Sequence, residues 1–373
     1  MKAKGAMLWE PGTKSGWIIE DLEIDPPKEN EVLIRLAASG LCHSDDHLDT
    51  GDIPVATPMV GGHEGAGVIE QLGPGVDRFE VGDHIVLSFL PTCGHCRFCV
   101  MGKSSLCDTS AGVLSGFAPD GTHRIHARGQ GVGTMSYLGT FCEYVVVPVD
   151  SCVRIDKAMP LDMAALIGCG VPTGWGSAVY AADPTPGDVC VVIGTGGVGM
   201  NAVQGFAYAG ASVVVAVDLI EYRRNRALEF GATHTAASMA EAEELIRELT
   251  RGVMADRGVL TAGVVHGEFI TPALKLIRKA GRLVWTGATP VSETELELNG
   301  LEFTMSAKQL QGTLLGSCNP QNDVPKLVNL YLNGQLKLDE LITRRYKLED
   351  VNQGYTDMRE GRNIRGLIDF SLS

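Results

Sequence analysis

The sequence predicts a two-domain α/β protein in which one domain is a doubly wound parallel sheet. Its 373 residues exceed the size at which a single hydrophobic core keeps growing, so two domains are expected. A β-branched run, a glycine-rich turn and a helical stretch follow one another at residues 188–209, as they do where a parallel strand leads into a helix. Further alternation of strand and helix patterns continues through Leu283–Trp285 and Gly287.

Composition excludes several classes of protein. Hydrophobic residues make up 45% of the chain and charged residues 20%, which is typical of a globular protein rather than a disordered one. The net charge of −14, without any basic run, argues against nucleic acid as a partner. Residues 1–27 lack the apolar core of a signal peptide, and no apolar stretch approaches membrane-spanning length, so we expect no membrane association. We therefore expect a cytoplasmic protein, in which ten cysteines favour metal binding or catalysis over disulfides.

The first candidate metal site is built from three residues that lie far apart in the sequence. Cys42, His63 and Cys169 offer two sulfur ligands and one nitrogen ligand, which zinc prefers. A zinc ion with three protein ligands keeps its fourth position for water or a substrate oxygen, as catalytic sites do. Asp45 is close enough to Cys42 in sequence to accept a hydrogen bond from His63 and fix which ring nitrogen faces the metal. Taken singly, each residue would more often be a core cysteine or an ordinary hydrogen-bonded histidine.

The second candidate metal site is a compact run of cysteines with the spacing C-x2-C-x2-C-x7-C, formed by Cys93, Cys96, Cys99 and Cys107. Four thiolates complete the tetrahedron of a zinc ion, so the predicted role is structural. An iron–sulfur cluster is the alternative, but bacterial ferredoxins place the fourth cysteine three residues on and follow it with proline, whereas Asp108 follows here. The other cysteines show no ligand spacing and are expected to pack in the core: Cys142, Cys152, Cys190 and Cys318.

A dinucleotide site is predicted where the strand expected at Asp188–Ile193 meets the helix expected at Met200–Ala209. The turn between them has the G-x-G-x-x-G pattern, in which the glycines allow a tight turn, close approach to a pyrophosphate and close packing of the helix on the strand. Its residues are Gly194, Thr195, Gly196, Gly197, Val198 and Gly199. The alternative is a glycine-rich turn in an unrelated α/β domain.

An acidic residue at the end of the next apolar run indicates which dinucleotide is bound. Asp218 follows Ser212–Val217 and lies nineteen residues beyond Gly199, where a carboxylate accepts hydrogen bonds from the adenosine ribose. A carboxylate there repels a 2′-phosphate, so NAD is favoured over NADP. Arg223 and Arg224 follow closely and leave NADP open. Farther on, Glu241–Thr250 has the pattern of an amphipathic surface helix.

Five motifs taken together resemble the zinc-containing medium-chain alcohol dehydrogenases, and the resemblance runs nearly end to end. The motifs are Cys42-His43-Ser44-Asp45, Gly62-His63-Glu64, the four-cysteine run, Ile167-Gly168-Cys169-Gly170 and Gly194–Gly199. The resemblance implies a GroES-like, mostly β catalytic domain of residues 1–171 and 314–373, with a Rossmann NAD-binding domain of residues 172–313 inserted in it. It also implies two zinc ions per chain and reversible oxidation of an alcohol to an aldehyde or ketone by hydride transfer to NAD.

The same resemblance implies roles for individual residues. Ser44 and His47 belong to a proton relay that includes ribose hydroxyls and reaches solvent at His47. Glu64 either approaches the zinc ion and assists ligand exchange, or is a solvated or arginine-paired carboxylate. Three further residues match cofactor contacts, His43 and Arg365 at the pyrophosphate and Thr173 beside the nicotinamide. The resemblance also implies a homodimer, or a larger assembly, formed by edge strands near Leu301–Gln311.

Within this family, three segments are most similar to an actinobacterial branch of nicotinoprotein alcohol dehydrogenases: Gly61–Gly65, Arg128–Gly131 and Asn363–Gly366. Membership of that branch implies that NAD stays bound and that electrons pass to an artificial nitroso acceptor or to the peptide-derived carrier mycofactocin. Val259–Gly267 replaces the acidic and aromatic segment usual in family members with exchangeable NAD. Whether NAD exchanges is therefore open at the level of sequence.

Two other functions are compatible with the scaffold. A thiol-adduct-dependent formaldehyde dehydrogenase shares it, but often has tyrosine at the position of His47. A non-catalytic zinc- and NAD-binding protein is the second, and the intact set Cys42, His63 and Cys169 argues against it. The sequence does not identify the alcohol, because chain-length preference depends on the walls of the substrate pocket.

Overall fold

The structure is a computed structural model that describes residues 1–13 and 15–372. It divides into two compact units, Met1–Cys169 with Asn319–Ser373, and Gly170–Cys318. The second unit begins two residues earlier and ends five residues later than the expected range 172–313. The reason for the later end is local: the turn Leu315–Ser317 packs on α4 (Gly170–Gly176), and the Cys318 thiol donates to the Pro172 carbonyl at 3.3 Å.

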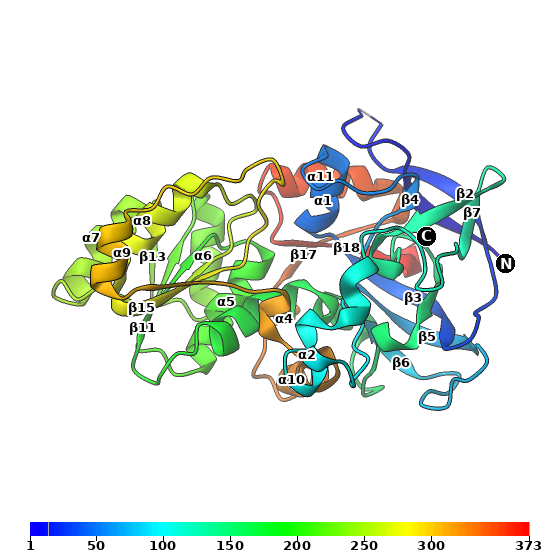
Figure 1. Cartoon of the computed structure of the whole chain (residues 1–373), viewed down its shortest axis with the longest axis horizontal. Coiled ribbons are helices and arrows are strands. Elements are labelled where there is room, and N and C mark those ends of the chain that lie inside the picture. The colour runs from blue at the N-terminus through cyan, green and yellow to red at the C-terminus, as the bar shows by residue number, and fades with distance from the viewer. Residues whose placement is uncertain (14, 373) are drawn as a thin grey trace. The chain divides into compact units, whose positions relative to one another are not determined.

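The first unit is mostly β and holds two sheets (Figure 1). One is a closed barrel in the order β1 (Lys2–Leu8), β2 (Ile18–Ile24), β7 (Ile125–Ala127), β8 (Gln130–Thr134) and β4 (Met59–Val60). The other runs β10 (Cys152–Arg154), β6 (His84–Leu87), β5 (Gly65–Leu72), β3 (Glu31–Gly40), β18 (Arg365–Asp369) and β17 (Ile342–Tyr346), with β9 (Tyr144–Pro148) also paired to β3. The helices of this unit are α1 (His43–Thr50), α2 (Arg97–Val100), α3 (Leu161–Ala165), α10 (Pro320–Leu332) and α11 (Val351–Arg359).

Strand β3 organises this unit because its two halves have different neighbours. Its first half pairs with β9 and its last residues pair antiparallel with β18, so the carboxyl-terminal segment completes a sheet begun by the amino-terminal one. The strand is buried on both faces, which its near-continuous run of apolar residues predicts. It ends at Gly40, directly before the buried Leu41 and Cys42.

The second unit is the doubly wound domain predicted from the sequence. All strands of its sheet pair in parallel, in the order β13 (His234–Ala236), β12 (Val213–Val217), β11 (Val189–Ile193), β14 (Ala255–Leu260), β15 (Ile277–Trp285) and β16 (Gln309–Gly312). Its helices are α4, α5 (Gly197–Tyr208), α6 (Glu221–Glu229), α7 (Met239–Leu249), α8 (Ile270–Lys275) and α9 (Gly300–Ser306), and they surround the sheet in Figure 1. Central strands such as Val-Val-Val-Ala-Val of β12 are apolar throughout because helices cover both faces.

Several local predictions are confirmed and one is wrong in part. The expected strands at 188–193 and 212–217 are β11 and β12, and the expected helix at 241–250 is α7. The cysteines expected in the core, Cys142, Cys152, Cys190 and Cys318, are all buried. The segment Leu301–Gln311, expected as an edge strand, begins as helix α9, and only β16 lies at the sheet edge. Among the described residues, no helix is both long and apolar enough to cross a bilayer.

Candidate functional site

The first metal-ligating group is assembled entirely within the first unit. Cys42 follows β3 and precedes α1, His63 lies between β4 and β5, and Cys169 follows the short turn Leu166–Gly168. One ligand atom from each of these residues, and one from Glu64, lie within 4.8 Å of one another, and all four side chains are buried. The structure thus brings together the three predicted ligands from positions that span over a hundred residues.

The donor atoms of this group fit a zinc ion. The Nε2 atom of His63 is buried and has no hydrogen-bond partner among the described residues, which is costly for a ring nitrogen unless a metal takes it. The Cys42 side chain forms a hydrogen bond with Cys169, and this contact is the main reason that the pKa of the Cys42 thiol lies well below its ordinary value. A thiolate of this kind is the form of cysteine that binds metal.

Asp45 holds His63 as the sequence predicts. Its Oδ2 atom lies 2.9 Å from His63 Nδ1, and its Oδ1 atom accepts a 2.9 Å hydrogen bond from the backbone N–H of Gly62. Both side chains are almost fully buried, and this burial raises the pKa of Asp45 although the neighbouring His63 opposes the rise. With Nδ1 engaged by the carboxylate, Nε2 is the nitrogen that faces the two sulfurs.

Glu64 and Arg365 form a buried ion pair beside these ligands. Arg365 Nη2 donates to Glu64 Oε2, and the exposed fractions of the two side chains are 5% and 0%. Of the two alternatives for Glu64, the pairing with an arginine is therefore present, while the carboxylate also lies among the candidate ligand atoms. Arg365 begins β18, the strand paired with the end of β3, which explains how a residue so late in the chain reaches this site. Its contact with a pyrophosphate stays a prediction.

The residues predicted for proton transfer lie on α1. The Ser44 hydroxyl is 3.6 Å from the Cys42 sulfur, next to the metal-ligating group. One turn farther on, the His47 side chain is almost fully buried, and its Nδ1 lies 3.0 Å from Asp52 Oδ2. The ring of His43, at the start of α1, has its centroid 6.4 Å from that of His47. Asp52 was not anticipated from the sequence, because nothing but its distance of five residues links it to His47.

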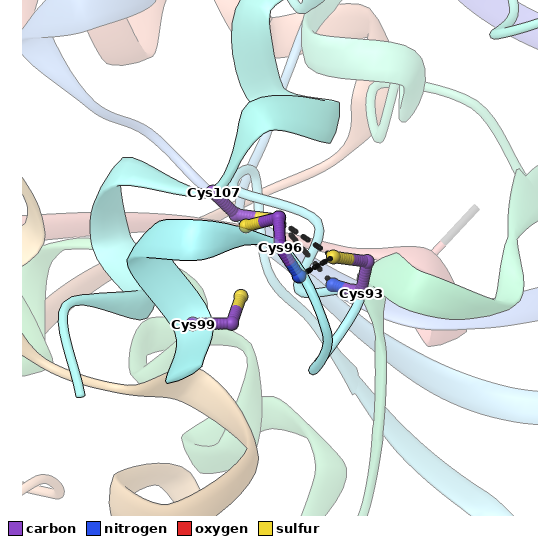
Figure 2. A group of neighbouring side chains, drawn as sticks. All are labelled: Cys93, Cys96, Cys99 and Cys107. Carbon is purple, nitrogen blue, oxygen red and sulfur yellow. Dashed lines mark hydrogen bonds between the residues drawn. The ribbon is translucent and has the colours of Figure 1, made fainter. Parts of the chain in front are cut away.

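The four cysteines of the run lie close together in the first unit, around α2 (Figure 2). We name residues 93–107 the cysteine lobe. Its sulfurs lie within 4.8 Å of one another, and the Cys107 sulfur is 3.5 Å from that of Cys93 and 3.7 Å from that of Cys96. A tetrahedral zinc ion with bonds of about 2.3 Å separates its sulfurs by about 3.8 Å, so the cluster has the size of a zinc site. Backbone N–H groups of Asp108 and Cys99 lower the pKa of Cys96 to about 6, which favours the thiolate.

The glycine turn of the second unit has the geometry predicted for a dinucleotide cradle. It connects β11 to α5, whose N-cap is Gly196. A Cβ atom on Gly199 would lie 1.9 Å from the Gly194 carbonyl oxygen, so only glycine allows this close packing. Asp218 follows β12, and its Oδ2 accepts a 2.8 Å hydrogen bond from the Thr195 backbone N–H within the turn. The predicted acidic residue therefore lies beside the predicted turn.

Other predicted cofactor residues of the second unit lie around this turn. Thr173 is on α4, which packs against α5. Arg223 is half-buried on α6, while its neighbour Arg224 donates to the Asp218 carbonyl at 2.7 Å. Thr261 was missed: its hydroxyl donates to the Gly194 carbonyl at 2.6 Å and so fixes the turn from the end of β14. A threonine after a strand carries no motif, so sequence alone could not single it out.

Comparisons with known proteins agree with this geometry. Residues 28–157 match the family model of the alcohol dehydrogenase GroES-like domain, and residues 197–333 match that of the zinc-binding dehydrogenases. The chain is 50% identical to an NDMA-dependent alcohol dehydrogenase of Amycolatopsis methanolica, over 99% of each chain. Among solved structures, benzyl alcohol dehydrogenase from Acinetobacter calcoaceticus matches with a TM-score of 0.92 at 29% identity, over 99% of each chain. A short chain alcohol dehydrogenase from E. coli CFT073, complexed with NADH, matches with a TM-score of 0.80 at 25% identity, again over 99% of each chain.

Proposed function

Since the chain belongs to the zinc-binding alcohol dehydrogenase family, with zinc and NAD as its cofactors, we propose that it oxidises an alcohol to an aldehyde or ketone while its NAD stays bound and passes electrons to an external acceptor. The observation that carries the proposal is the buried group Cys42, His63 and Cys169, a donor set that holds zinc with one position left for substrate. The dependence of the Amycolatopsis relative on NDMA supports the external acceptor.

In this proposal the first unit binds and orients the alcohol oxygen. When bound, zinc acts as a Lewis acid that lowers the pKa of a hydroxyl group, and the oxidised nicotinamide accepts the hydride. Asp45 keeps His63 in the orientation that ligation needs, and the buried Arg365 balances the charge of Glu64 close to the two cysteine sulfurs. These residues therefore hold the site in one geometry.

The proton leaves along α1. Ser44 is placed to take part because its hydroxyl lies 3.6 Å from the Cys42 sulfur, beside the group that holds the metal. His47 is suited to the outer end of the path because imidazole accepts and releases protons near neutral pH. We assign Ser44 as the inner hydroxyl and His47 as the group that delivers the proton to solvent.

Retention of NAD is supported by two loops of the second unit that hydrogen bonds hold together. Dinucleotides bind at the carboxyl ends of the strands of such a sheet, and these loops follow β14 and β15 at that edge. The Glu293 carboxylate accepts from the Gly267 backbone N–H at 2.6 Å and lies 2.7 Å from His266 Nδ1. The backbone N–H of Val265 also donates to the Ala288 carbonyl at 2.8 Å. We name residues 261–269 and 286–298 the two-loop clasp.

The proposal extends to partners and location. A redox carrier such as mycofactocin oxidises the retained NADH, so that exchange of NADH for free NAD is not needed. The exposed edge strand β16 pairs with its counterpart in a second copy to form a homodimer. The chain acts in the cytoplasm, which is supported by the lack of a disulfide among its ten cysteines, all of which lie within the described residues.

Cofactor analysis combined with turnover tests the proposal. Purified protein is denatured, and the released zinc and NAD(H) are measured per chain. The native protein is then assayed with alcohol and either added NAD or NDMA as the acceptor. We expect two zinc ions and one nucleotide per chain, turnover with NDMA, and little turnover with NAD alone. Full turnover with added NAD and no co-purified nucleotide would refute retention, and the absence of the second zinc ion would refute the catalytic assignment.

A further inference from the structure

Asp52 lies against His47, the residue at the outer end of the proposed proton path. The distance between His47 Nδ1 and Asp52 Oδ2 is 3.0 Å. The side chain of His47 is 4% exposed and that of Asp52 is 34% exposed, so the carboxylate connects a buried imidazole with the surface. The same Asp52 oxygen accepts a 2.8 Å hydrogen bond from the Thr50 hydroxyl, which holds the carboxylate in place.

The end of helix α1 produces this contact. The helix ends at Thr50, and Gly51 adopts a left-handed conformation with φ of 85°, as glycine does at helix ends. The chain then folds back, so that the backbone N–H of Ile53 donates to the His47 carbonyl at 3.2 Å. The turn that ends α1 therefore places Asp52 beside the imidazole of His47.

Two other carboxylates of α1 that are near His47 in sequence are engaged by an arginine. Asp46 and Asp49, the neighbours of His47 on α1, both accept from Arg359 of α11, at 2.5 and 3.0 Å. The ring of His43 has its centroid 6.4 Å from that of His47. Asp52 is the carboxylate that forms an ion-pair contact with His47 in the described part of the chain.

We propose that Asp52 is a positioning residue for proton release, acting through His47; this inference rests on the proposed function. A carboxylate on Nδ1 takes the Nδ1–H as a hydrogen bond, so the proton that leaves the alcohol is accepted at Nε2. It also stabilises the protonated imidazole that forms when the proton arrives. Asp52 thus sets the tautomer of His47, without touching substrate or cofactor.

The test is the pH dependence of nicotinamide reduction by alcohol in a single turnover of the holoenzyme, followed by absorbance. Asp52→Asn keeps the size of the side chain and removes its charge. We expect the limiting rate to fall roughly tenfold, because the imidazole that accepts the proton loses the group that fixes its tautomer. We also expect the pH profile of the variant to differ from that of the wild type, because the imidazole loses the carboxylate that accepts from Nδ1.

Two further variants distinguish failure of the role proposed for Asp52 from failure of the proposed proton path. Asp49→Asn removes the charge of a carboxylate that is two residues from His47 in sequence but pairs with Arg359. This variant should leave the pH profile unchanged. In the His47→Gln background, Asp52→Asn should have no additional effect. If Asp52→Asn matches Asp49→Asn, or acts equally with and without His47, the inference fails. If His47→Gln itself leaves rate and profile unchanged, the proposed proton path fails as well. Zinc content and melting temperature establish that each variant is folded.

Discussion

Cys169 is a predicted zinc ligand whose replacement tests the proposed catalytic site. Its sulfur belongs to the buried ligand group and is hydrogen-bonded to Cys42. We expect Cys169→Ser to lose one zinc ion per chain and at least a hundredfold in alcohol oxidation, since three ligands are needed to hold the catalytic ion. Zinc analysis by atomic emission and an acceptor-linked assay measure the two effects. As the control, Cys152→Ser changes a buried cysteine outside both clusters and should keep the full zinc content. An active Cys169→Ser enzyme would contradict the ligand assignment.

Asp357 is a buried residue whose contribution to the stability of the fold can be measured separately. Its fully buried carboxylate accepts from the Tyr346 hydroxyl at 2.7 Å, Arg344 at 2.8 Å and Arg362 at 3.3 Å. These contacts, led by that with Tyr346, lower the pKa of Asp357. We expect Asp357→Asn to reduce the free energy of unfolding at neutral pH by roughly 1 to 2 kcal/mol.

The pH dependence of that effect has a definite sign. A carboxylate with a lowered folded-state pKa stabilises the fold above its unfolded pKa, about 4, and ceases to do so as the pH falls through the folded value. Urea denaturation of wild type and Asp357→Asn should therefore show a difference that is constant near neutral pH and shrinks in acid. A difference that grows in acid would exclude this origin.

At the scale of elements, the two-loop clasp is the feature that we propose slows release of the cofactor. Glu293→Ala removes its contacts with Gly267 and His266, each worth about 1 kcal/mol. We expect the rate of NADH release, measured by fluorescence after dilution into excess competitor, to rise roughly tenfold. Glu295→Ala removes a carboxylate from the same loop and is the matched control. Equal release from both variants would show that the clasp does not control retention.

The cysteine lobe around α2 is the second element with a separable role. Apart from α2 it contains short turns, and large apolar side chains such as Val100 and Met101 are exposed, so a metal rather than a core holds it together. We expect Cys96→Ser to lose one zinc ion and to increase hydrogen exchange at residues 93–107. Exchange in the sheet of the second unit should remain that of the wild type. A protected lobe without zinc would refute its structural role.

For the whole molecule, the second unit is a continuous segment with its own core and sheet. We expect residues 170–318 expressed alone to unfold cooperatively on heating, as followed by circular dichroism. Residues 1–169 alone lack β17 and β18 and should not fold, because the end of β3 loses β18, one of the two strands that pair with it. Cooperative folding of 1–169 alone would contradict the dependence on the carboxyl-terminal strands.

Motifs with a fixed spacing were predictable from the sequence, and contacts made by the fold were not. The cysteine run and Gly194–Gly199 each act within a few residues, so spacing alone reports their geometry. Cys42, His63 and Cys169 were predicted from ligand chemistry and family resemblance, since no local pattern links them. The contacts of Asp52 and Glu293 depend on how a turn or loop folds back, and their residue types are common at surfaces. The pairing of Arg365 with Glu64 depends on which strand lies beside β3.

The late position of β18 has a consequence for synthesis of the chain. The ribosome adds Arg365 long after Cys42, His63, Glu64 and Cys169. Until then, the carboxylate of Glu64 lies among the predicted metal ligands without the arginine that balances its charge. During that interval the end of β3 also lacks the strand that covers it. A premature stop before Arg365 therefore leaves an open sheet edge beside an uncompensated buried carboxylate, and we expect such a chain to misfold rather than to give a slightly shortened enzyme.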